Sequence, residues 1–173
     1  MKKGIIIVLL SVILSLIVVF VYNKITAPNV AYVDLGKLYS EFSLKKELEQ
    51  KYKQTSELRK NILDSLRLQI QIKSKNSALK KNEKDQAELN LLKEQYYYKE
   101  QQFTEDNRVL SEKYNEQVLN QMNQYVMDFS KDKAYDFVFG ANSSGSLMYA
   151  SSAYDITEQV TNYINEKYQG VKK

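Results

Sequence analysis

The sequence has no cysteine, no histidine and no tryptophan, and its 173 residues include one proline and five glycines. Without cysteine and histidine there is no thiol nucleophile, imidazole base or disulfide, and the two commonest zinc ligands are missing. An enzyme would depend on carboxylates and lysines alone, and the sequence gathers them into no pocket-like cluster. We therefore predict a protein that is not an enzyme, with no catalytic residues, no cofactor and no metal.

The scarcity of glycine and proline is greatest in the middle of the chain, since neither residue occurs between Gly36 and Gly140. This stretch is rich in lysine, glutamate, glutamine, leucine and tyrosine, a composition typical of long helices. It far exceeds the ~11 residues of a mean helix. A helical pattern of this length indicates a coiled coil or two helices folded back on each other.

Apolar residues recur in this stretch at steps of three, four or seven, the spacing of a coiled-coil seam. Between the two stripes, residues 73–85 are mostly polar. We predict an antiparallel helical hairpin over residues 43–131 with its tip at about 74–85, and one unbroken helix is the alternative. The predicted stripes are Leu44, Leu48, Tyr52, Thr55, Leu58, Ile62 and Leu66 in the first arm, and Leu89, Leu92, Tyr96, Phe103, Leu110, Tyr114, Val118, Met122, Tyr125 and Phe129 in the second.

Both ends of the hairpin carry signals for β structure and helix caps. Residues 30–35 predict a strand, after which Asp34 caps a helix. Residues 136–139 and 147–150 flank a turn and predict a β-hairpin, and Asp155 and Glu158 have capping-box spacing at the start of a last helix. We assign 30–42 and 132–168 to one head domain that completes its small core by oligomerising. Its predicted oligomerisation residues are Tyr32, Val33, Phe137, Val138, Phe139, Leu147, Tyr149, Ile156, Val160 and Ile164.

The N-terminus predicts a membrane-targeting segment. Residues 5–22 are almost entirely apolar and follow Lys2 and Lys3. Eighteen helical residues span ~27 Å, enough for a bilayer core and longer than the apolar region of most cleaved signal peptides. We predict a signal anchor, a transmembrane helix over residues 1–24, joined by a linker at 25–29, and a cleaved signal peptide is the alternative. In both cases the remaining chain lies outside the cytoplasm.

Charge argues against a nucleic-acid partner. The net charge is +4, and three of those charges come from Lys2, Lys3 and Lys24, which leaves the rest of the chain almost neutral. The charge is unevenly placed, because residues 43–86 hold twelve basic and six acidic residues, whereas 87–131 hold five and eight. The basic excess at the tip fits contact with anionic lipid headgroups, contact with acidic segments of a binding partner, or simple solvation. It consists of Lys73, Lys75, Lys80, Lys81 and Lys84.

Three consecutive tyrosines, Tyr96, Tyr97 and Tyr98, lie in the second arm, with Phe103 nearby. Consecutive helical residues point in different directions, so at least one of the three rings must lie outside the seam. We predict these four residues as candidate contacts for a binding partner, although tyrosine is also tolerated on solvated helix faces.

The segments AYVDLGKLYSEF at 31–42 and FVFGANSSGSLMYASSAYDITEQV at 137–160, separated by a charged coiled coil, resemble the Skp/OmpH family of periplasmic chaperones. The resemblance covers about residues 30–168. It implies a homotrimer in which strands of three subunits form a body and three helical hairpins enclose a cavity. It further implies an ATP-independent holdase that keeps unfolded outer-membrane β-barrel proteins from aggregating. The retained N-terminus and the nearly neutral charge of this chain depart from the family pattern.

The sequence is also compatible with two other functions. A membrane-anchored coiled-coil scaffold or tether in the cell envelope would have no need of a β-hairpin and a capped helix. An adaptor of an export pump also combines an anchor, a helical hairpin and β structure, but this sequence has too little β-forming content for its lipoyl and barrel domains.

Overall fold

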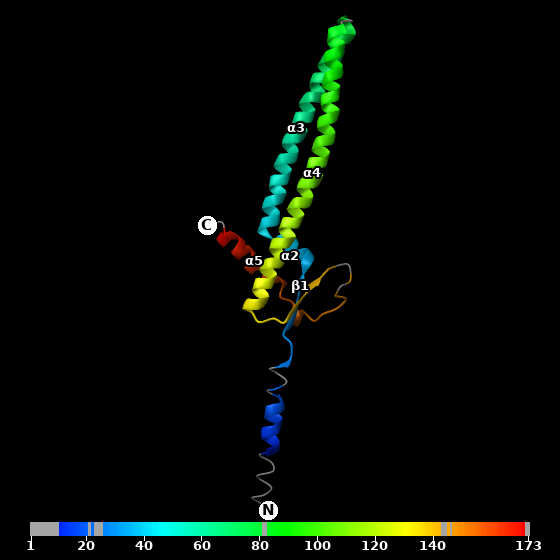
Figure 1. Cartoon of the computed structure of the whole chain (residues 1–173). Coiled ribbons are helices and arrows are strands. Elements are labelled where there is room, and N and C mark those ends of the chain that lie inside the picture. The colour runs from blue at the N-terminus through cyan, green and yellow to red at the C-terminus, as the bar shows by residue number, and fades with distance from the viewer. Residues whose placement is uncertain are drawn as a thin grey trace, which may run out of the picture.

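The computed structural model describes residues 11–20, 22, 26–80, 83–142, 145 and 147–171. A long helical hairpin rises from a small mixed head, in which the two ends of the hairpin meet (Figure 1). The chain is therefore mainly helical with a small β part, as predicted. In chain order the elements are β1 (Val30–Asp34), α2 (Leu35–Glu41), α3 (Ser43–Lys80), α4 (Glu83–Asp132), β2 (Phe137–Ala141), η1 (Ser152–Tyr154) and α5 (Thr157–Val171).

The two arms of the hairpin are α3, with 38 residues, and α4, with 50. They run side by side in opposite directions (Figure 1). At 1.5 Å per residue α3 alone is ~57 Å long. α3 ends at Lys80 and α4 begins at Glu83, both inside the predicted tip, and this stretch contains no glycine or proline.

One predicted cap and part of a predicted capping box are present in the head, since the Asp155 N–H donates to the Ser152 carbonyl and not to Glu158. The Asp34 carboxylate accepts a hydrogen bond of 2.9 Å from the Lys37 N–H at the start of α2. The Asp155 carboxylate accepts one of 2.9 Å from the Thr157 N–H at the start of α5. The Thr157 hydroxyl in turn accepts a hydrogen bond from the Asp34 N–H, so the two helix starts are tied together.

A break between α2 and α3 is a feature that the sequence did not predict. Phe42 leaves the helical conformation, with φ −67° and ψ 125°, and its ring is completely buried. The side-chain amide of Asn165 on α5 spans the break, since its oxygen accepts from the Ser43 N–H at 2.7 Å and its nitrogen donates to the Glu41 carbonyl at 3.3 Å. The backbone groups freed by the break are thereby paired.

The predicted β-hairpin is wrong. β2 pairs in parallel with β1, with Val30 opposite Phe137 and Val33 opposite Gly140, and residues 147–150 form no strand. The helical hairpin returns the chain to its starting point so that β2 runs alongside β1 in the same direction. The partner available to β2 is therefore β1, and the turn residues after Ala141 do not redirect the chain into a second strand.

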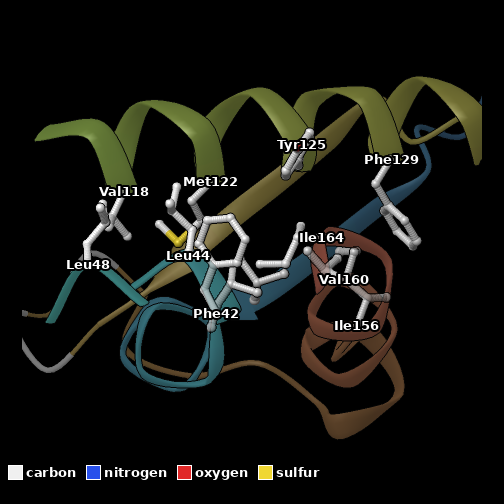
Figure 2. Packing of buried hydrophobic residues seen from close by; sticks show 13 residues of the cluster. Phe42, Leu44, Leu48, Val118, Met122, Tyr125, Phe129, Ile156, Val160 and Ile164 are labelled. Carbon is white, nitrogen blue, oxygen red and sulfur yellow. The ribbon is translucent and has the colours of Figure 1, made fainter. Parts of the chain in front are cut away.

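One hydrophobic core joins the head to the base of both arms (Figure 2). Four residues of α4 point toward α2, the start of α3 and α5, and Phe42 lies between them. The core is therefore larger than the two head segments alone. Its buried members are Ala31, Val33, Leu38, Phe42, Leu44, Leu48, Val118, Met122, Tyr125, Phe129, Ile156, Val160 and Ile164.

Beyond this core, the seam departs from the predicted one at two positions of α3, while the predicted stripe of α4 is buried or half-buried. Leu58 and Ile62 were expected in the seam, yet 65% and 45% of their surfaces are exposed. Their neighbours Arg59 and Leu63 are half-buried instead. Arg59 reaches across to α4, where it donates hydrogen bonds to Asn107 and Asp106, and the aliphatic pair lies outward.

The predicted membrane segment falls partly outside the described residues. Residues 11–20 are helical and exposed, whereas 1–10, 21 and 23–25 are not described. Within the described part of the chain, no helix has both the length and the apolar content needed to cross a membrane.

Candidate functional site

Cross-helix polar contacts hold the distal half of the hairpin. The Arg59 guanidinium lies 3.4 Å from the Asp106 carboxylate and 5.7 Å from the centre of the Phe103 ring. Further along α3 toward the tip, Arg67 donates a hydrogen bond of 2.8 Å to the Tyr96 hydroxyl, and this bond raises the pKa of Arg67. The basic excess of the first arm thus faces the acidic excess of the second.

The predicted tyrosine cluster divides between the seam and the surface. The Tyr96 ring is half-buried and its hydroxyl donates to Glu100 at 2.9 Å, and Phe103 is half-buried beneath two cationic side chains, Arg59 and Lys99. Tyr97 and Tyr98 are 63% and 69% exposed. Only these two rings of the four candidates are fully presented to a partner.

The predicted basic tip is also divided. Lys73 lies between the two arms, where its ammonium pairs with Glu88 and, at 3.5 Å, with Asp85. The hydrogen bond with Glu88 raises the pKa of Lys73 and lowers the pKa of Glu88. Lys75 and Lys84 are exposed. The side chain of Lys80 and all of Lys81 lie outside the described residues.

A shallow groove runs along one side of the distal hairpin, and we call it the hairpin groove. It consists of two adjoining hollows that share Gln69, and both arms contribute to it. Its aliphatic lining is Leu58, Ile62, Leu66, Ile72, Leu91 and Leu92, and its polar lining is Asn61, Ser65, Gln69, Lys73, Glu88, Gln95 and Lys99. Leu58 and Ile62 line this groove because they lie outside the seam between the two arms.

A smaller hollow lies at the base of the hairpin. Its volume is about 190 Å³ and its lining includes Tyr39, Tyr52 and Tyr114. Ligand pockets usually measure ~300–1,000 Å³, so this hollow is too small for most small-molecule ligands. No three potential metal ligands come together anywhere in the described chain.

The predicted oligomerisation residues of the head fall into three groups. Val33, Ile156, Val160 and Ile164 lie in the core of the single chain, and Tyr32, Val138 and Leu147 are half-buried. Phe137 and Phe139 are exposed side by side on β2 with their rings stacked 6.1 Å apart. Tyr149 is 86% exposed, and Met148, which sequence reasoning did not select, is 89% exposed.

The comparisons with known proteins agree with this architecture. The family described as outer membrane protein (OmpH-like) matches residues 29–164, most of the chain. The chain belongs to the OmpH-like family. The crystal structure of a candidate outer membrane chaperone (OmpH-like) from Caulobacter crescentus CB15 superposes with a TM-score of 0.71 at 16% identity, covering 82% of this chain and 86% of that one. No curated protein matches.

Membership in the OmpH-like family confirms the resemblance found in the sequence. It covers the head and both arms and begins at residue 29, after the apolar segment. At 16% identity the structural likeness shows the shared fold alone. The hairpin groove and the exposed rings are features of this chain's own residues.

Proposed function

We propose that this OmpH-like protein is an ATP-independent holdase of the periplasm that binds unfolded outer-membrane proteins. The observation that carries the proposal is the set of large apolar side chains that the hairpin leaves outside its own seam. Leu58, Ile62, Ile72 and Leu91 are exposed although half-buried positions lie one residue away. Such surface is unfavourable in a helix that only spans a distance, and it is useful to a protein that binds apolar segments.

A holdase acts by mass action, because anything that binds the unfolded chain lowers the concentration free to aggregate. Many weak contacts suffice for this, and no nucleotide or catalytic group is required. The hairpin offers contacts of this kind along its length, in the hairpin groove and at Tyr97 and Tyr98.

The proposal includes a homotrimer joined through the heads. Phe137 and Phe139 form a stacked apolar pair on β2, and Met148 and Tyr149 extend the exposed apolar surface of the head. The outer side of β1 is bonded to Ile156 and Thr157, so the outer edge of β2 is the one that favours pairing with another chain. We propose that the surface of these four residues joins neighbouring heads, so that three hairpins surround a common cavity.

We further propose that residues 5–22 anchor the trimer in the inner membrane. The apolar segment precedes the head by a short linker, so an anchor would place the head next to the membrane. Unfolded proteins would then meet the hairpins as they leave the inner membrane. The distal end of the hairpin lies at the opposite end of the molecule from the described N-terminal residues 11–20 (Figure 1).

The test measures aggregation directly. The full-length chain is placed in lipid nanodiscs, an unfolded outer-membrane β-barrel protein is diluted from urea, and light scattering is followed. A holdase lowers scattering in proportion to its concentration without ATP. Crosslinking of lysines in native membranes should give bands of two and three subunits and none larger. Unchanged scattering would favour an envelope scaffold, and a single-subunit band would contradict the trimer.

A further inference from the structure

The hairpin groove has dimensions that fit one extended polypeptide segment. From Leu58 to Ile72 it follows fourteen residues of α3, or ~21 Å of helix. An extended chain advances ~3.3 Å per residue, so about six residues fill this length. Leu58, Ile62 and Leu66 recur every four residues, a rise of ~6 Å, and alternate residues of a strand recur every ~6.6 Å.

The polar lining of the groove fits the backbone of such a segment. Asn61, Gln69 and Gln95 carry side-chain amides, each with two donor hydrogens and an acceptor oxygen. An unfolded extended segment has unpaired N–H and C=O groups along both edges, and these amides can bond to them without reading its sequence. The groove therefore offers apolar contacts to alternate side chains and hydrogen bonds to the backbone between them.

Charge and size decide between this occupant and others. Of the charged groups in the groove, Lys73 and Glu88 neutralise each other, which leaves Lys99 as the remaining charged side chain of the lining. A nearly neutral groove does not suit an anionic lipid surface or a nucleic acid. The thirteen residues that line it are fewer than the ~20–30 residues per partner of a stable protein interface. This size fits a weak, reversible contact better than a second copy of this chain.

We propose that the hairpin groove binds an extended segment of about six residues in which apolar and polar side chains alternate. The inference rests on the proposed holdase function and names the feature of the client that is recognised. Strands of outer-membrane barrels alternate in this way. The site differs from the tyrosine cluster selected from the sequence, and Leu58 and Ile62 are two of its four exposed aliphatic side chains, the others being Ile72 and Leu91.

The first experiment locates binding on the full-length chain in nanodiscs. Because the sequence has no cysteine, Ile62→Cys creates a unique site for a benzophenone photocrosslinker. Leu68→Cys is the matched control, since Leu68 is an exposed aliphatic residue of the same helix outside the groove. The probes are two biotinylated ten-residue peptides of identical valine, serine and threonine content, one alternating and one with its valines in a single block.

We expect the alternating peptide to crosslink about tenfold more at position 62 than at position 68, and several-fold more than the block peptide at position 62. Equal crosslinking at the two positions would overturn the groove as the site. A preference for the block peptide would overturn the alternation. Crosslinks between two copies of this chain, in place of the peptide, would assign the groove to self-association.

The second experiment separates this inference from the holdase function. The variant Leu58→Gln with Ile62→Gln is compared with the control Leu68→Gln with Leu119→Gln, in which both replaced residues are also exposed. Exposed substitutions of this kind change folding stability little. We expect the groove variant to bind the alternating peptide about tenfold more weakly and to need more protein to suppress aggregation. If the groove variant still suppresses aggregation fully and binds the peptide as before, the groove is refuted as the binding site and the holdase function still stands. If the unmodified chain binds the peptide but does not suppress aggregation, the holdase function alone is refuted.

Discussion

Replacing Asn165 with alanine tests whether its side-chain amide holds the break at the base of the hairpin. The substitution removes the acceptor of the Ser43 N–H, 2.7 Å away, and the donor to the Glu41 carbonyl, 3.3 Å away. Both bonds are partly buried beside the fully buried Phe42. A buried backbone group left without a partner costs ~1–3 kcal/mol. Because water reaches part of this site, we expect a total loss near the middle of that range, about 2 kcal/mol.

The assay is thermal unfolding followed by circular dichroism at one protein concentration. For a chain of this size 1 kcal/mol corresponds to ~2–4 °C in Tm, so Asn165→Ala should lower Tm by roughly 4–8 °C. Asn165→Asp keeps an acceptor at the start of α3, where a negative charge is favourable, and should lose less. Hydrogen exchange at the Ser43 amide should accelerate in the alanine variant.

Asn162→Ala is the matched control, since Asn162 lies one turn earlier on α5 and is exposed. If Asn165→Ala and Asn162→Ala melt at the same temperature, the amide does not stabilise the break. An unchanged exchange rate at Ser43 would lead to the same conclusion.

Three further predictions concern the head and the tip. A Cβ at Gly140 would lie 2.6 Å from Leu35 Cδ1, so Gly140→Ala should lower stability by ~1–3 kcal/mol, and adding Leu35→Ala should restore part of it in a double-mutant cycle of chemical unfolding. Hydrogen bonds from Thr157 hold the pKa of Asp155 below its ordinary value, so the contribution of Asp155 to folding stability is complete above its unfolded pKa of ~3.9 and is lost as pH falls through the lowered pKa. The variant Asp155→Asn should therefore lose less stability on acidification, as measured by its melting temperature at several pH values. An identical loss of stability in the variant and the unmodified chain would contradict this. Lys73→Met should accelerate amide exchange near the tip at low salt and much less at 1 M salt, whereas Lys75→Met should have no such effect.

The helical hairpin and its caps were predictable because each depends on local chemistry. A stretch without glycine or proline and with apolar steps of three and four has few alternatives to a long helix. Asp34 and Asp155 precede helices at positions where a carboxylate accepts backbone N–H groups, and both do so in the structure. These signals are contained within a few neighbouring residues.

The seam register was not predictable from apolar spacing, since two patterns share the first arm. Leu58, Ile62 and Leu66 form one stripe, and Arg59, Leu63 and Leu66 form another. Hydrophobicity favours the first, whereas the structure uses the second, in which Arg59 meets Asp106 and Phe103 across the seam. The choice depends on which residues of α4 lie opposite, and that information is nearly fifty positions away in the chain.

The pairing in the head depended on similar long-range information. The turn residues after Ala141 predicted a local hairpin, but β1 lies alongside β2 once the helical arms have folded back. The Asn165 amide has no sequence signal either, because its partners are backbone groups more than 120 positions away. Contacts of this kind are fixed by tertiary packing.

The choice of register connects the stability of the hairpin with its proposed use. Polar contacts such as Arg59 with Asp106 and Lys73 with Glu88 align the arms with less apolar burial than a leucine seam would give. A seam built on Leu58 and Ile62 would bury more apolar surface and would leave the outer face polar. The observed register instead places basic and acidic residues between the arms and keeps aliphatic residues accessible. The proposed binding of unfolded chains requires such accessible aliphatic residues. Local departures from the most stable pattern are expected where function depends on them.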